Sequence, residues 1–311
     1  MTSRDTRTAV VTGAAGFVGT HCARSLATAG WRVVGVDRIL PSGGAGGLSL
    51  YSSFLQDDLQ DRAPLAAMLA QEEPVALIHA AGPASVEASF KSPAVDYHAQ
   101  TGPLVTVLEA LRITGAQTHA VLCSSAAVYG NPVSLPVEEC ALQNPISPYG
   151  FHKAAKEALV REYCDLFGVK ASISRIFSVF GPGQRQLAVF DITRRMLAGD
   201  FSIFGTGQET RDYLYIDDAA DALRTIAEKG AGNGEAINVA SGEEMSIRDL
   251  AMSIAAILNL PQKAVAVQEG EAKGKPGRWR ADTGRLAGLG FTPQVGIDEG
   301  LRRTVEWIRG Q

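Results

Sequence analysis

The sequence predicts an α/β fold in which a doubly wound parallel sheet is followed by a smaller C-terminal α/β lobe. The first half alternates short apolar runs with longer helical patterns. A glycine-rich turn joins the first strand to the first helix, and the alternation loosens beyond the punctuation at Gly181-Pro182-Gly183. With 311 residues, of which 46% are hydrophobic, the chain is long enough to bury a core in each part.

The first βαβ unit is expected to comprise a strand at 8–12, a helix at about 17–29 and a strand at 32–37. Further strands are expected at 75–79 and 120–124, each followed by a helical stretch. Parallel strands joined by helices form a sheet that is covered on both faces.

We assign residues 1–177 to a dinucleotide-binding domain, together with a segment at about 212–240 that returns to it. Residues 178–311 are expected to form mainly the substrate lobe. The glycine-dense run 41–47 is expected to be a flexible loop without chemistry, because it offers few side chains to pack.

Charge and cysteine content exclude several classes of protein. The net charge is −4, and lysine and arginine are scattered along the chain, so no nucleic-acid partner is expected. The four cysteines lack paired spacing, which argues against a disulfide framework and a metal site. No apolar stretch reaches the roughly 18 residues that a membrane span needs. We therefore expect a soluble, cytoplasmic protein without a membrane partner.

Glycines at 13, 16 and 19 follow the first strand and open the first helix. In that position, backbone N–H groups and the positive end of the helix can approach a pyrophosphate, as in a Rossmann-type fold. Asp37 ends the second strand, where a carboxylate binds the ribose hydroxyls of NAD. The neighbouring Arg38 could instead pair with the 2′-phosphate of NADP. Because Asp37 would repel that phosphate, we rank NAD first.

Other polar and small residues follow later strands of the same half. Asp58 has two interpretations, a contact to the adenine amine or a helix N-cap. The small residues of Ala80-Ala81-Gly82 would let a cofactor lie against the backbone at the end of the fourth strand. His79, just before them, is interpreted as structural.

Tyr149 and Lys153 are spaced one helical turn apart, so they lie on one face of a helix. A phenol titrates near pH ~10 and is a poor base at neutral pH unless its phenolate is stabilised. A nearby ammonium provides that stabilisation by charge attraction. With the glycine-rich turn, the pair predicts a dehydrogenase-type active site, although the same spacing also occurs on ordinary amphipathic helices.

Several motifs together resemble the extended short-chain dehydrogenase/reductase family, and more narrowly its nucleotide-sugar epimerases and dehydratases. They are the strings at 12–19, 124–130, 149–153, 175–182, 204–213, 215–218 and 238–242. The resemblance covers nearly the whole chain.

The resemblance implies roles for individual residues. Ser125, with Ser124 as the fallback, would hydrogen-bond the sugar hydroxyl. Tyr149 would accept the hydroxyl proton, and Lys153 would also hold the nicotinamide ribose. The cofactor site is thus expected to include Gly13, Gly16, Phe17, Val18, Gly19, Asp37, Arg38, Asp58, Leu59, Ala80, Ala81, Gly82, Tyr149, Lys153 and Ile176.

The second lobe would meet the nucleoside diphosphate. Arg211 resembles the arginine that binds the diphosphate, a role suited to a planar, permanently charged fork, with a plain surface residue as the alternative. Phe204 would pack either on the nucleobase or in the protein core. Arg278 would add a phosphate contact, and Trp279 would line the sugar pocket. The expected substrate-binding residues are Ser85, Ser124, Ser125, Ser178, Phe204, Arg211 and Arg278.

The two residues directly after Ser125 indicate the reaction. Dehydratases of this family carry an acidic pair there, whereas this chain has Ala126 and Ala127. Elimination would therefore lack its acid and base. No Cys–His pair for proton exchange accompanies the active strand, where Cys123 is expected to be buried. NAD-dependent epimerisation of a nucleotide-diphosphate sugar at C4 is our first choice.

Two alternatives stay open. The family's usual asparagines are replaced at Ser178 and within 97–103, which leaves an NAD(P)H-dependent 4-keto sugar reductase as the second choice. A non-catalytic NAD(H)-binding module is the third.

Family members pair through two helices per subunit, so the resemblance also implies a homodimer. The matching segments are 103–114 and 148–167, with Leu104, Val107, Leu108 and Leu111 at helical spacing. Spacing alone does not separate this interface from packing against the protein's own core.

Overall fold

A large parallel sheet forms the centre of the molecule. The computed structural model describes residues 7–42, 45–262, 265–268, 274 and 276–311. Seven strands pair in the order β10-β6-β5-β4-β1-β2-β3, and every neighbouring pair is parallel. They are β1 (Thr8–Thr12), β2 (Arg32–Asp37), β3 (Ser53–Gln56), β4 (Ala76–His79), β5 (His119–Ser125), β6 (Ala171–Ile176) and β10 (Asn233–Val239). The predicted fold class is therefore confirmed.

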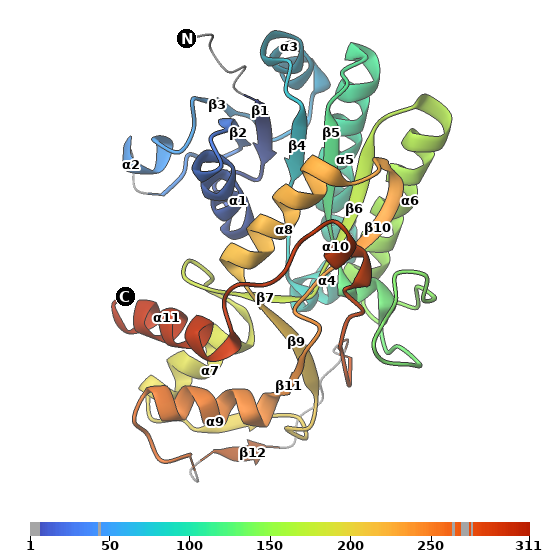
Figure 1. Cartoon of the computed structure of the whole chain (residues 1–311). Helices are drawn as coiled ribbons and strands as arrows, with labels where there is room; N and C mark the ends of the chain where they lie inside the picture. The colour runs from blue at the N-terminus through green and yellow to red at the C-terminus, as the bar shows by residue number, and fades with distance from the viewer. Residues whose placement is uncertain (1–6, 43–44, 263–264, 269–273, 275) are drawn as a thin grey trace.

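Helices cover both faces of this sheet (Figure 1). Strand side chains alternate between the faces, so Val11 joins one apolar cluster with α1 and α8, whereas Val10 joins a second cluster with α3, α5 and α6. The helices of this part are α1 (Phe17–Thr28), α2 (Ala45–Leu48), α3 (Arg62–Glu72), α4 (Val86–Lys91), α5 (Pro93–Thr114), α6 (Pro148–Phe167) and α8 (Ile216–Lys229), with a 3₁₀ turn η1 (Ala126–Tyr129). None of the helices in the described ranges is both long and apolar enough to cross a bilayer.

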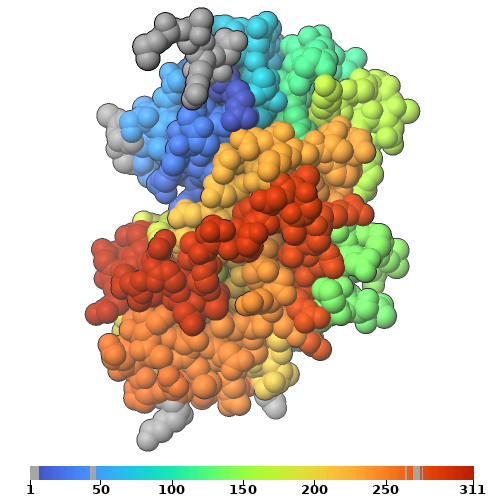
Figure 2. All heavy atoms as spheres, in the orientation of Figure 1, coloured from blue at the N-terminus to red at the C-terminus, as the bar shows by residue number. Residues whose placement is uncertain are grey.

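Smaller sheets lie beyond the carboxyl ends of the central strands, in the lower part of Figure 1. The first contains β7 (Ser178–Phe180), β9 (Thr210–Tyr215) and β11 (Glu244–Ser246), and the second pairs β8 (Ser202–Phe204) with β12 (Ala266–Gln268). Their helices are α7 (Leu187–Leu197), α9 (Ile247–Ile257), α10 (Gly284–Gly288) and α11 (Ile297–Arg309). Figure 2 shows the C-terminal residues filling the lower half of the molecule, below the N-terminal residues.

Three expectations about local structure need correction. The run 41–47 is not loop throughout, because α2 begins at Ala45; an ideal Cβ on Gly47 would lie 2.4 Å from the Ser42 carbonyl oxygen, so glycine permits a close turn there. Residues 43–44 lie outside the described residues. The helix expected at 103 begins at Pro93 and continues through Pro103.

The third correction concerns the predicted dimer residues. Leu104, Val107, Leu108 and Leu111 are each at most 2% exposed, and they pack in the same cluster as the central strands. These four side chains therefore belong to the protein's own core.

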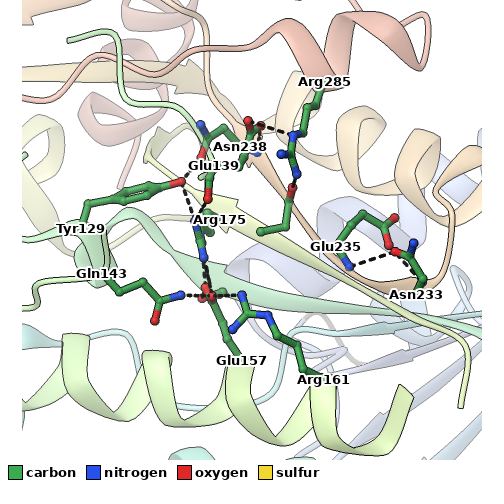
Figure 3. Close-up of polar contacts among 12 residues, drawn as sticks. Tyr129, Glu139, Gln143, Glu157, Arg161, Arg175, Asn233, Glu235, Asn238 and Arg285 are labelled. Atoms are coloured by element: carbon green, nitrogen blue, oxygen red, sulfur yellow. Dashed lines mark hydrogen bonds and ion pairs between the residues drawn. The ribbon is translucent and has the colours of Figure 1, made fainter. Parts of the chain in front are cut away.

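A buried ion pair fastens α6 to the sheet (Figure 3). Arg175 at the end of β6 donates through Nη2 to Oε2 of Glu157 at 2.7 Å, and both side chains are at most 2% exposed. Arg175 also donates to the Tyr129 hydroxyl at 2.9 Å and to the Glu139 carbonyl at 2.8 Å. Burial lowers the pKa of Arg175, but the pairing with Glu157 outweighs it, and the net shift is upward.

Replacing Arg175→Met should destabilise the fold, because it leaves Glu157 buried with its main cation removed. We expect a loss of about 3–5 kcal/mol in the free energy of unfolding, measured by urea denaturation at pH 7. As a control, Lys91→Met removes an exposed pair with Glu87 on α4 and should change stability by less than about 0.5 kcal/mol. Equal effects of the two substitutions would contradict this interpretation.

Candidate active site

The glycine-rich turn lies against the end of the neighbouring strand. Gly13 has φ of +71°, and an ideal Cβ there would lie 2.7 Å from the backbone of Ala80 and Ala81. A Cβ on Gly19 would lie 2.1 Å from the Gly13 carbonyl oxygen. The N-cap of α1 is Gly16, which has no side chain to occupy the first N–H groups of the helix. Phe17 and Val18 follow as the first two residues of the helix.

Asp37 points into this turn from the end of β2. The backbone N–H of Ala15 donates to its Oδ2 at 3.0 Å, and the N–H of Ile39 donates to its Oδ1 at 3.2 Å. Arg38 is exposed. A carboxylate held beside the glycine turn suits ribose hydroxyls and opposes a second phosphate, so these residues fit NAD better than NADP.

Asp58, which follows β3, does not cap a helix as one interpretation expected. Asp58 accepts a hydrogen bond from the Gln60 N–H at 3.3 Å, but the N-cap of α3 is Asp61, whose side chain accepts from Ala63. The interpretation of Asp58 as a helix cap was therefore wrong, because α3 begins one turn later. Leu59 beside it is buried in the left-handed conformation, with φ of +58°.

The end of β4 reaches the same edge of the sheet. His79 is buried, and its Nδ1 lies 2.8 Å from the Thr12 hydroxyl, which agrees with its interpretation as structural. The small residues Ala80 and Ala81 face the glycine turn, and Gly82 continues the chain with φ of +132°.

Helix α6 begins in close contact with η1. Ser147 caps the helix by accepting from the Gly150 N–H at 3.1 Å, and Pro148 occupies the first turn. A Cβ on Gly150 would lie 2.6 Å from the Ala127 carbonyl oxygen, so only glycine allows this approach. The N–H of Tyr149 donates to the Ser89 hydroxyl at 3.1 Å. The position of Tyr149 is thus fixed by its neighbours on both sides.

Lys153 lies under Tyr149, as the spacing predicts. Its Nζ is 5.4 Å from the centroid of the Tyr149 ring and donates to the Cys123 carbonyl at 3.1 Å. Both side chains are largely buried, with 8% of Tyr149 and 6% of Lys153 exposed. The ammonium and the phenol ring thus lie close together in a largely buried position.

The two serines at the end of β5 have different surroundings. Ser124 is buried and donates to Oε1 of Glu157 at 2.7 Å. Ser125 is partly exposed, caps η1, and accepts from the Ala127 N–H at 3.2 Å. Ile176 pairs with Ser125 in the register of β5 and β6. Ser125, rather than Ser124, is therefore free to meet a ligand at this edge.

Arg211 on β9 is a partly buried cation. Among the residues that the structure describes it forms no ion pair with a carboxylate; its Nη1 donates only to its neighbour, the Thr210 carbonyl, at 2.7 Å. Its guanidinium lies 5.4 Å from the Trp279 ring centroid, and burial lowers its pKa. Arg211 is intermediate in exposure, so both interpretations of it stay predictions. A partly buried guanidinium without an anion is suited to bind one from outside.

The remaining candidates of the second lobe are more varied. Phe204 is 60% exposed, with the Arg195 guanidinium 4.5 Å from its ring centroid, so the core interpretation was wrong for it. Arg278 is exposed and pairs with Glu244. Trp279 is buried and donates through Nε1 to the Gly130 carbonyl at 3.0 Å. Ser85 caps α4, and Ser178 begins β7.

Sequence reasoning missed the residues that hold these segments together. Asp212 accepts hydrogen bonds from the Ser241 and Gly242 N–H groups and from the Ala281 N–H, at 2.7 to 3.1 Å. It thereby ties β9, which carries Arg211, to the segment that carries Trp279. The position of Asp212 directly after Arg211 was the sequence signal that could have identified it. Glu157, one turn after Lys153, was missed in the same way.

A glycine turn that holds a carboxylate, on the same sheet as a Tyr–Lys pair, is typical of NAD-dependent enzymes that act on an alcohol or ketone. The chain belongs to the NAD dependent epimerase/dehydratase family, whose model matches residues 9–240. A UDP-glucose 4-epimerase of Mycolicibacterium smegmatis is 34% identical over 97% of this chain and 98% of its own.

Solved structures of relatives share the whole fold. A UDP-glucuronic acid 4-epimerase from Bacillus cereus, in complex with UDP-glucuronic acid and NAD, matches with a TM-score of 0.88 and 28% identity over 97% of this chain and 99% of its own. DesIV, a dTDP-glucose 4,6-dehydratase from Streptomyces venezuelae with NAD bound, matches with a TM-score of 0.87 and 26% identity over 98% and 97%. Because both reactions occur on this fold, the choice between them depends on the residues of the site.

Gly19→Ala should abolish tight binding of NAD, because the added methyl group meets the Gly13 carbonyl at 2.1 Å and must displace the turn. We expect the dissociation constant, measured by calorimetry, to rise at least about tenfold, which corresponds to about 1.4 kcal/mol. Gly288→Ala, in α10 with nothing near its Cβ, is the matched control and should bind normally. Unchanged affinity in Gly19→Ala would show that the cofactor binds elsewhere.

Proposed function

We propose that this protein is an NAD-dependent epimerase that inverts C4 of a nucleotide-diphosphate sugar through a transient keto sugar. The observation that carries the proposal is the combination of the Tyr149–Lys153 pair with buried alanines at 126 and 127. The site has the groups to oxidise an alcohol and return the hydrogen, but Ala126 and Ala127 provide no acid or base for eliminating a hydroxyl.

Bound NAD supplies a two-electron acceptor for the hydrogen on C4 of the sugar. We propose that Ser125 holds the C4 hydroxyl and that Tyr149 takes its proton. Lys153 favours the phenolate that makes this transfer possible, and its bond to the Cys123 carbonyl keeps the ammonium below the ring. After the keto sugar rotates within the pocket, the hydrogen is delivered to the other face of C4, and Tyr149 returns the proton to the oxygen.

The cofactor would lie along the glycine turn. We propose Gly13, Gly16 and Gly19 for the pyrophosphate, and Asp37 for the ribose hydroxyls. The remaining cofactor contacts expected from the sequence stay part of this proposal, as does the division of the chain near residue 177.

The diphosphate of the substrate would meet Arg211, because it is a partly buried cation without an ionic partner in the described parts of the chain. Two nearby polar atoms also lack partners there, the Tyr213 hydroxyl and Nε of Arg280. Relatives were solved with UDP-glucose and with UDP-glucuronic acid, which supports a nucleotide sugar as the substrate. Phe204, Ser178, Ser85 and Arg278 are proposed as further contacts.

We also propose that the protein is a cytoplasmic homodimer. Support for the dimer comes from apolar side chains of α5 and α6 that face solvent rather than the core. They include Val95, Tyr97, Ile113, Phe151 and Phe167, each between 43% and 68% exposed. We propose these exposed side chains as the dimer contacts, instead of the buried residues Leu104, Val107, Leu108 and Leu111.

Purified protein should interconvert the gluco and galacto forms of a UDP sugar without net NADH. Tyr149→Phe removes the proton acceptor and should lower the rate about a hundredfold or more, while NAD still binds. With a panel of UDP and dTDP sugars, NMR measures epimerisation and absorbance at the NADH band measures net NADH. Consumption of added NADH with a 4-keto sugar would select the reductase instead. NAD binding without any turnover would select the binding module.

Arg211→Met should weaken substrate binding more than it slows the chemical step. The substitution removes a positive charge that would contact the diphosphate, not the reacting carbon. We expect KM to rise at least about tenfold and kcat to change less. The control is Arg302→Met on α11, which pairs with two glutamates of the same helix at the surface. A normal KM for Arg211→Met would place the diphosphate elsewhere.

A further inference from the structure

Lys156 is a buried amine that the proposed mechanism does not use. It follows Lys153 by three residues on α6 and therefore lies near the face of the helix that carries Tyr149. Its side chain is 0% exposed. Nζ has no hydrogen-bond partner among the residues that the structure describes. A charged ammonium in such a position would bear the full cost of desolvation.

The titratable groups that interact electrostatically with Lys156 lie on its own helix and on α5, β5 and β4. They are Lys153 on its own helix, Asp96 on α5, Cys123 on β5 and His79 on β4. Asp96 is the carboxylate of this set, but its Oδ2 lies 2.5 Å from Nδ1 of His152. The Nδ1 of His79 contacts the Thr12 hydroxyl, whereas its Nε2 is buried without a hydrogen-bond partner among the described residues. No anion in the described chain is therefore paired with Lys156.

The two lysines compete for positive charge in one buried region. Lys153 has the Cys123 carbonyl as an acceptor and the Tyr149 ring beside it, whereas Lys156 has neither. Burial first, and then the charge of Lys153, lowers the pKa of Lys156 well below its usual range. Lys156 thus lacks the contacts that stabilise an ammonium, whereas Lys153 has them.

We propose that Lys156 is a positioning residue for the Tyr149–Lys153 pair: it fills the space beneath the pair as an uncharged amine, so that this region carries one positive charge, on Lys153. The part of this inference that concerns the cofactor rests on the proposed function. If NAD⁺ binds beside Tyr149 as proposed, a second ammonium in this region would add to the positive charge that the oxidised cofactor meets and would weaken its binding.

The uncharged state has a consequence for stability. In the unfolded chain a lysine is protonated below pH about 10.4. If Lys156 is uncharged in the folded protein, the unfolded state binds one more proton between its folded pKa and that value. Stability then rises with pH across this window and is lowest toward acid.

Lys156→Met keeps the length of the side chain but cannot titrate, so it tests directly whether Lys156 is uncharged in the folded protein. Urea denaturation between pH 7 and 9 should show the variant to be more stable than the wild type at pH 7. The ratio of the two unfolding constants should shrink by about tenfold per pH unit. Lys91→Met on α4, an exposed lysine, should leave the slope unchanged. Parallel curves for Lys156→Met and wild type would overturn the proposal.

Cofactor affinity provides a second readout that a purely structural role would not move. In the wild type, acidification should weaken the binding of NAD⁺ more than that of NADH, and Lys156→Met should remove this difference. Lys156→Arg keeps a permanent charge, and at neutral pH it should lower the NAD⁺ affinity at least about tenfold relative to NADH.

If Lys156→Arg does not fold, the pH comparison between wild type and Lys156→Met still decides. The same pH dependence in both proteins would refute the charge-limiting role. Neither measurement uses turnover of a sugar, so failure of the proposed epimerase activity would be recognised separately.

Discussion

The buried ion pair between Glu157 and Arg175 is the constraint on which the active edge depends. It fixes α6 to β6 four residues after Lys153, and through the Tyr129 hydroxyl it reaches Asn238 on β10. Glu157 also accepts from Ser124, next to Ser125. Figure 3 shows the Glu157–Arg175 part of this network. Because α6 also carries Tyr149 and Lys153, and Ser124 precedes Ser125, a shift of α6 would move the phenol relative to the serine.

A second constraint is the shortage of anions around the cations of the site. Lys153 is satisfied by a carbonyl, and Arg211 by the carbonyl of its own neighbour. Lys156 has no partner in the described chain. Cations left without carboxylates attract the negative groups of a ligand, and they limit how much positive charge the interior can hold. On this view the same electrostatics bind the diphosphate, favour the phenolate and keep Lys156 uncharged.

Local patterns in the sequence were enough to predict the central sheet, the glycine turn and the Tyr–Lys pair, because each depends on neighbours a few residues apart. The segment 103–114, taken from the resemblance, covers only part of α5, which begins at Pro93 and continues through Pro103. Partners distant along the chain escaped prediction: Asp212 with Ala281, and Arg175 with Glu157. Spacing carries no record of such contacts, since they arise only when strands and helices meet.

The central claim is that the hydrogen on C4 leaves as a hydride and returns to the same carbon, with Tyr149 moving only the hydroxyl proton. The most direct test is to incubate the enzyme with a UDP-gluco sugar in D₂O and to examine both epimers by NMR. The account predicts that the galacto product forms with no deuterium at C4 or C5. Deuterium on either carbon would show that a carbon-bound proton exchanges with solvent, and it would contradict the account.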